Sequence, residues 1–112
     1  MTLTQTPFVL VHLLNAIGGK LQVLQSAGQL ATITAQNQGA GTVYLQFFDF
    51  VAQPSNGATP TFAPVPLPAG TYYESDAPRG FVNGCWVCVS TTATTLTANG
   101  TDLYLDAGGL HN

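Results

Sequence analysis

The stretch that most constrains the fold is the apolar, extended segment of residues 41–50. With the two-residue period of a β-strand, Val43, Leu45 and Phe47 share one face. The opposite face carries four more side chains, which are Tyr44, Gln46, Phe48 and Phe50. A strand that is apolar on both faces belongs inside a sheet and not at a wet edge. We therefore expect a second sheet to cover one face, and a loop, the N-terminal arm or another copy of the protein to cover the other.

Residues 85–91 form a second strong strand pattern, which contains both cysteines of the chain. Its side chains alternate between two faces, with Cys85, Val87 and Val89 on one and Trp86, Cys88 and Ser90 on the other. Because strand residues three apart point in opposite directions, the two thiols can neither form a disulfide nor share a metal ion. A zinc site would also need further ligands, and His12 and His111 lie near opposite ends of the chain. We predict two buried free thiols and no cofactor.

Turn residues divide the rest of the chain into short segments. Strands are predicted at residues 20–25, 30–36 and 71–75, and an edge strand at 61–67 because prolines there cannot donate to a ladder. Residues 53–61 lack periodicity and are predicted to form a surface loop.

The clearest hairpin is predicted around Asn99-Gly100, where it joins residues 91–98 to residues 101–107. In its second strand Leu103 and Leu105 point inward, and the outward residues are Asp102, Tyr104 and Asp106. The total is seven to eight short strands and no convincing helix. This pattern predicts an all-β fold, an antiparallel β-sandwich or jelly roll.

The predicted sandwich domain spans residues 19–107, between an N-terminal arm of residues 1–18 and a tail of residues 108–112. The arm is apolar from Phe8 to Leu14 and fits either a strand at 8–13 or a short helix at 8–16. Such a segment must dock on something, either its own domain or a neighbouring subunit.

Charged residues make up only 6% of the chain, against about 25% in an average soluble domain. Two basic residues and a net charge of −3 argue against nucleic-acid binding, and no apolar run is long enough to cross a membrane. A surface of hydroxyls, amides and apolar groups suits a protein packed against others. A small secreted or poorly soluble domain is the alternative interpretation.

The titratable side chains do not form a recognisable catalytic set. Glu74 and Asp76 share one strand face and do not oppose each other across a cleft, as a glycosidase would require. Arg79 follows them and is expected to pair with them at the surface. No nucleophile-elbow or phosphate-binding motif is present. We predict that the protein is not an enzyme.

Four segments together resemble small β-rich virion proteins of tailed bacteriophages, which decorate or cement the capsid. The segments are G-T-V-Y-L-Q-F-F-D at 41–49, V-P-L-P-A-G at 65–70, G-F-V-N-G at 80–84 and S-T-T-A-T-T-L-T at 90–97. The resemblance covers roughly residues 30–107. It implies a sandwich or jelly-roll fold, homotrimers at the three-fold positions of the capsid lattice and no enzymatic role, and it supplies no catalytic residues.

The resulting hypothesis is a phage capsid decoration protein that binds major capsid protein, sits on the virion surface and is made in the host cytoplasm. Seven residues are expected to divide between the core and intermolecular contacts, and they are Phe8, Leu10, Phe48, Phe50, Tyr72, Tyr73 and Trp86. A Phe48→Asp change is expected to leave the monomer folded but weaken binding. The alternatives are a tail, baseplate or head-fibre module, and a small carbohydrate-binding β-sandwich that stacks sugars on exposed aromatic rings.

Overall fold

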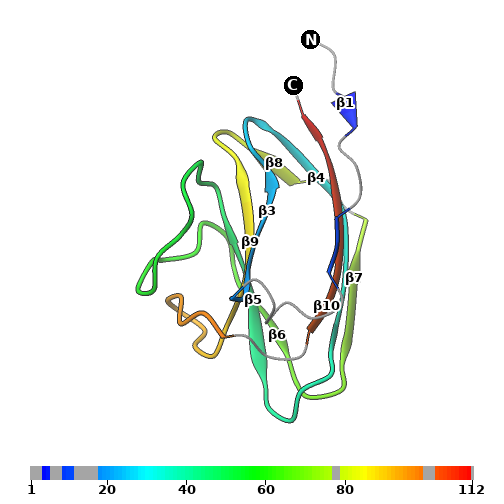
Figure 1. Ribbon diagram of the computed structural model, residues 1–112, viewed down its shortest axis with the longest axis vertical. Coiled ribbons are helices and arrows are strands. Elements are labelled where there is room, and N and C mark those ends of the chain that lie inside the picture. The colour runs from blue at the N-terminus through cyan, green and yellow to red at the C-terminus, as the bar shows by residue number, and fades with distance from the viewer. Residues whose placement is uncertain (1–3, 6–8, 12–17, 77–78, 100–102, 112) are drawn as a thin grey trace.

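A computed structural model describes residues 4–5, 9–11, 18–76, 79–99 and 103–111 of the chain (Figure 1). These residues form ten strands in two antiparallel sheets and contain no helix. The strands are β1 Thr4–Gln5, β2 Val9–Val11, β3 Lys20–Leu24, β4 Gly28–Asn37, β5 Val43–Phe48, β6 Val65–Leu67, β7 Tyr72–Ser75, β8 Arg79–Phe81, β9 Cys85–Ser90 and β10 Leu103–His111. Consequently no helix long and apolar enough to cross a membrane occurs in this part of the chain.

The two sheets pack face to face with the strand pairing of a jelly roll (Figure 1). Sheet A has β10 and β4 at its centre, with β1 and β2 along the outer edge of β10 and β7 and β8 along that of β4. Sheet B has the order β3-β9-β5-β6. The pairs nest, because β5 pairs with β6, β4 with β7 and β8, β3 with β9, and β2 with β10. The predicted all-β sandwich or jelly roll is confirmed.

The main core lies between the sheets and uses the strand faces that the alternation predicts. Strand β5 contributes Val43, Leu45 and Phe47, and β9 contributes Cys85, Val87 and Val89, all at most 3% exposed. Leu103 and Leu105 of β10 also point inward, as expected. Removal of this apolar surface from water supplies most of the driving force for folding.

The outer face of sheet B is covered by two loops of its own chain, residues 49–64 and 91–99 (Figure 1). A second buried cluster forms beneath them from Phe48, Cys88 and Leu96. Phe50, Ala58, Trp86 and Ala98 pack against this cluster. Loops therefore cover the second face of strand β5, which is the first of the three alternatives considered for that face. Phe48 is fully buried within one chain, so the expectation that Phe48→Asp would leave the monomer folded is corrected.

The predicted hairpin around Asn99-Gly100 does not form. Strand β10 pairs with β4 along its whole length, from Leu103 opposite Asn37 to His111 opposite Gly28. Residues 91–97 are an irregular loop and form no strand beside β9, although an isolated bridge joins Ser90 to Ala98. The hydroxyl of Thr92 donates to the carbonyl of Thr95 at 2.6 Å, and such local bonds compete with a ladder.

Both ends of the chain pair with strands of their own domain. Thr4 lies opposite His111, and Val9 lies opposite Ala107, so β1 and β2 extend sheet A. The strand alternative for the arm is therefore confirmed at residues 9–11. Residues 108–111, predicted as part of a tail, continue β10. Position 109 requires glycine, because the Cβ of any other residue would lie 2.6 Å from the carbonyl oxygen of Gln29.

Candidate functional site

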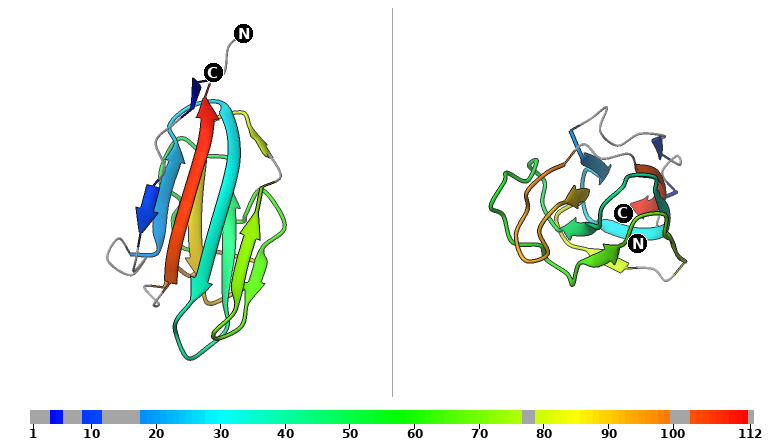
Figure 2. Two further views of the ribbon diagram at one scale, coloured as in Figure 1. Left: turned by 90° about the vertical axis from the view of Figure 1, so that its right-hand side faces the viewer. Right: turned by 90° about the horizontal axis from the view of Figure 1, so that it is seen from below.

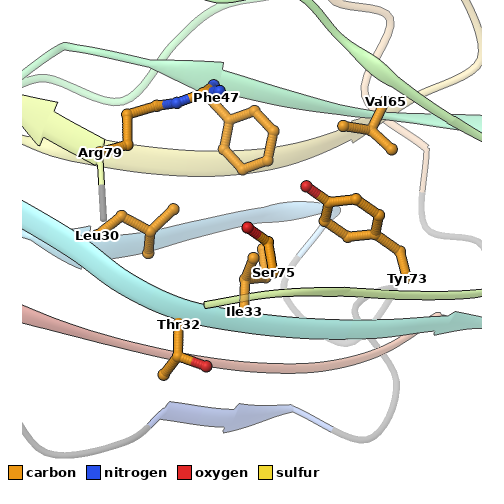
Figure 3. Close-up of a pocket in the computed structure, with 8 residues that line it drawn as sticks. All are labelled: Leu30, Thr32, Ile33, Phe47, Val65, Tyr73, Ser75 and Arg79. Carbon is orange, nitrogen blue, oxygen red and sulfur yellow. The ribbon is translucent and has the colours of Figure 1, made fainter. Parts of the chain in front are cut away.

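A cavity of about 100 Å³ opens between the sheets where β7 and β8 face β6 (Figure 3). Its lining residues are Leu30, Thr32, Ile33, Phe47, Val65, Tyr73, Ser75 and Arg79. The hydroxyls of Tyr73 and Ser75 point into the space between the sheets, whereas the hydroxyl of Thr32 points away (Figure 3). The cavity thus combines an apolar lining with polar groups near its rim.

Arg79 contacts two aromatic rings at this cavity. Its guanidinium carbon lies 4.6 Å from the ring centre of Phe62 and 5.6 Å from that of Phe47, distances typical of cation–π contacts. The expected ion pairs with Glu74 and Asp76 are not found among the described residues. The reason is that the side chain turns toward the rings that cover the edge of the core.

A shallow groove of about 290 Å³ lies on the outer face of sheet A. Tyr104, Gln36 and Tyr72 sit side by side on three adjacent strands, so the two tyrosines form its walls. Tyr72 is 61% exposed and Tyr104 is 43% exposed. Figure 2 shows this face with no described segment lying over it. Sheet A therefore presents an open aromatic face, in contrast to the covered face of sheet B.

The neighbouring row of side chains on that face is acidic. Asp106, Thr34 and Glu74 occupy adjacent positions across β10, β4 and β7. The hydroxyl of Tyr72 donates to Oε2 of Glu74 at 3.0 Å, and this bond is the main reason that the pKa of Tyr72 is raised. Nearby carboxylates, including Asp106, raise that pKa further because they disfavour a phenolate. The open face accordingly carries negative potential.

Asp49 uses its charge to hold the turn before β9. Its carboxylate accepts backbone N–H bonds from Val82 at 2.9 Å, Asn83 at 2.7 Å and Gly84 at 3.2 Å. Burial by itself raises the pKa of Asp49, but the three N–H donors together outweigh it and leave the pKa below its ordinary value. This carboxylate is a structural anchor, since its oxygens are already engaged by the backbone.

Gln46 secures the covering loop on sheet B. The side chain is fully buried, and its Nε2 donates to the carbonyls of Thr92 at 2.8 Å and Thr95 at 3.1 Å. Its Oε1 is buried without a hydrogen-bond partner. Gln46 therefore ties residues 91–97 to strand β5 at the cost of one unsatisfied acceptor.

The two cysteines are buried free thiols, as predicted. Cys85 faces the main core and Cys88 faces the second cluster, so they lie on opposite faces of β9. Burial raises the pKa of Cys85 strongly and that of Cys88 to about 12, which leaves both unreactive at neutral pH. Within the described residues, no group of three or more His, Cys, Asp or Glu side chains is placed to hold a metal ion.

The seven interface candidates fall into different environments. Tyr72 is exposed, and Phe50, Tyr73 and Trp86 are half-buried. The indole N–H of Trp86 donates to the carbonyl of Val51 at 3.2 Å. Phe48 lies in the second cluster and is removed from the candidate surface.

The remaining two candidates lie in the N-terminal segment. Leu10 lies in β2 opposite Asp106, and Phe8 lies outside the described residues. The sequence candidates omit Tyr104, although the alternation of residues 102–106 already placed it outward. The structure brings Tyr104 into one row with Tyr72, which lies more than thirty residues away in sequence.

Comparisons with known proteins found no relative of this chain. No protein family, curated protein or solved structure matches the chain.

Proposed function

We propose that the protein is a non-enzymatic structural protein of a tailed-phage particle. In this proposal it decorates the capsid and stabilises it by binding major capsid protein across subunit boundaries. The single observation that carries the proposal is the asymmetry of the sandwich. Loops of the chain cover the outer face of sheet B, whereas none of the described segments covers the outer face of sheet A, which carries Tyr72 and Tyr104.

The open face has the chemistry of a protein contact. Tyrosine is enriched at protein interfaces, because its ring excludes water and its hydroxyl can still form hydrogen bonds. Tyr72 and Tyr104 flank Gln36, whose amide can both donate and accept hydrogen bonds. We infer that this face, and not the second cluster around Phe48, binds the capsid or another copy of the chain.

The composition supports the same proposal. Only seven residues carry a charge at neutral pH, so the surface outside the acidic row of sheet A repels neither a second copy nor a lattice of subunits strongly. The sequence resemblance also implies the sandwich or jelly-roll architecture that the chain adopts. A protein that binds the assembled shell, but not its separated subunits, stabilises the shell by mass action.

Two measurements test the proposal. The first is the solution mass of the purified protein by light scattering, for which we expect a trimer. The second is the location of the protein on purified particles of the phage that encodes it, by antibody labelling in electron microscopy. A protein absent from purified particles contradicts the proposal, and label on the tail or baseplate favours another virion component.

A second candidate function is carbohydrate binding, and the groove of sheet A favours it. Tyr72 and Tyr104 lie two strands apart in one sheet, which separates their backbones by about 10 Å, and their exposed rings could stack on sugar faces. Thr34, Gln36 and Asp106 in the same groove could bind hydroxyl groups. A glycan array separates the two functions, because a capsid decoration protein should bind no glycan specifically.

A further inference from the structure

The cavity at the β6 edge holds one of only two basic side chains in the chain. Five carboxylates give the protein its net charge of −3, and three of them, Glu74, Asp76 and Asp106, lie on or beside the open face of sheet A. Lys20 is in β3, on the opposite edge of sheet B from β6. Arg79 therefore marks a local cationic site on an acidic protein.

The guanidinium of Arg79 is oriented by its packing. The guanidinium is planar, and its carbon lies over the rings of Phe62 and Phe47, so that these contacts restrict its rotation. Its five N–H donors lie along the edge of that plane, in a fork that matches the two oxygens of a carboxylate. Among the described residues, no side chain or carbonyl accepts a hydrogen bond from this fork.

The opposite side of the cavity supplies a second donor. The hydroxyl of Tyr73 points into the space between the sheets (Figure 3). The hydroxyl of Ser75 points into the same space (Figure 3). Leu30, Ile33 and Val65 line the rest of the cavity with apolar atoms. The donors thus lie next to an apolar surface that suits a short hydrocarbon stem.

We propose that this cavity binds a carboxylate on a short alkyl stem. The Arg79 fork receives the two carboxylate oxygens, the Tyr73 hydroxyl donates to one of them, and the stem packs on the apolar lining. A volume of about 100 Å³ equals that of roughly three waters, which fits a group the size of acetate or propionate. A monoanion is favoured over a phosphate dianion, because a single guanidinium neutralises one charge and Glu74 and Asp76 lie nearby.

Two sources can supply this group, a free small acid or a glutamate side chain of another protein. The test is a titration of the ¹⁵N-labelled protein, followed through the amide resonances of Thr32, Ser75 and Arg79. Acetate and propionate represent a free small acid. A glutamate that is acetylated at its amino group and amidated at its α-carboxyl group represents the side chain of a partner protein. Acetamide and the corresponding glutamine compound are the neutral controls, and sodium chloride controls for ionic strength.

We expect saturable shifts with a dissociation constant on the order of 1 mM for acetate, since so few atoms contribute. The Arg79→Lys change keeps the charge but loses the fork, and should weaken binding about tenfold. Tyr73→Phe removes only the hydroxyl, and should weaken binding about threefold to tenfold. Tyr104→Phe makes the same change on the open face of sheet A and should leave binding unchanged.

Equal shifts with acetamide, or unchanged affinity in a folded Arg79→Lys variant, would overturn the proposal. Shifts that do not saturate by about 100 mM acetate would also overturn the proposal. Even the weak affinity expected for a four-atom ligand gives saturation at that concentration. Tighter binding of the blocked glutamate than of propionate assigns the site to a partner protein, and the reverse order assigns it to a free acid. Because the titration needs no capsid, its outcome is independent of the proposed function.

Discussion

The Phe48→Ala substitution tests whether the two loops over sheet B form a true second core. Phe48 is fully buried by these loops, and its ring centre lies 5.4 Å from that of Phe50. Strand β5 also carries Leu45, fully buried on the opposite face in the main core. Alanine substitutions at Leu45 and Phe48 therefore compare the stability contributions of the two hydrophobic clusters on a single strand.

The expected loss of stability follows from burial and from the cavity left behind. Exposing a fully buried phenylalanine side chain costs about 1.5–3 kcal/mol in transfer free energy. The unfilled cavity raises the usual cost of a buried Phe→Ala change to about 3–5 kcal/mol. Because loops collapse into a cavity more easily than a second sheet does, we expect about 3 kcal/mol for Phe48→Ala.

The assay is equilibrium unfolding in urea, followed by tryptophan fluorescence and far-ultraviolet circular dichroism. Trp86 packs on the cluster that contains Phe48, so its fluorescence reports on that cluster. A loss of about 3 kcal/mol should lower the urea midpoint by about 1–3 M, for slopes typical of small domains. The control is Tyr72→Ala, which removes an exposed ring and should change stability by less than about 0.5 kcal/mol.

A loss below about 1 kcal/mol for Phe48→Ala would refute the assignment of Phe48 to a buried core. That result would return Phe48 to the candidate interface residues, especially if the variant also failed to self-associate. A loss equal to that of Leu45→Ala, by contrast, would mean that the loops pack as rigidly as the opposing sheet.

Three further predictions concern the turn before β9, a close backbone approach and the thiols. Asp49→Asn should lower stability by about 1 kcal/mol at pH 7, after allowance for solvent exposure, and urea midpoints should show the gap closing at acid pH. The lowered pKa of Asp49 gives this sign, because its stabilisation is full above the unfolded-state value and is lost as pH falls through the folded-state pKa. Gly84→Ala should lower the melting temperature by several degrees, since its Cβ would lie 2.7 Å from the carbonyl oxygen of Phe50, whereas Gly41→Ala meets no atom within 4 Å and should be nearly neutral. Both thiols should react with a chromogenic disulfide reagent at pH 8 only after unfolding, because burial raises their pKa values.

Each of these three predictions has a clear contradicting result. A constant gap between wild type and Asp49→Asn from pH 7 to pH 2 would mean that the charge of Asp49 does not support the turn. Equal melting temperatures for the two alanine variants would contradict the close approach at Gly84. Rapid labelling of the folded protein would contradict burial of the cysteines.

The side-chain faces of β5 and β9 could be predicted because they follow from local alternation. Period-2 alternation places Leu45 with Phe47, and Val87 with Val89, whatever the strands pair with. The buried state of both cysteines follows from the same alternation, since apolar neighbours flank them on each face. The open groove was predictable only in part, because alternation turns Tyr104 outward but does not place it beside Tyr72.

The prediction of a hairpin around Asn99-Gly100 was wrong, because it used local sequence signals, whereas β10 pairs with a strand that is distant in the sequence. An Asn-Gly pair between two β-prone segments is a strong turn signal. Strand β10 nevertheless pairs with β4, more than sixty residues earlier in the chain. The polar groups of residues 91–97 instead bond to the hydroxyls of Ser90 and Thr92 and to the amide of Gln46. Threonine-rich segments suit both strands and such loops, so composition could not separate the two.

By itself, the sequence determined the all-β class, the two-faced strands at residues 43–48 and 85–90, the free thiols and the sparse charge. These properties depend on residue type and on a two-residue period, both of which are local. Only the tertiary structure decided which strands pair, that loops cover Phe48, that Arg79 lies on Phe62, and that Tyr72 meets Tyr104 across β4. Those contacts join residues far apart in the chain, and their free energy depends on how the whole sandwich closes around one core.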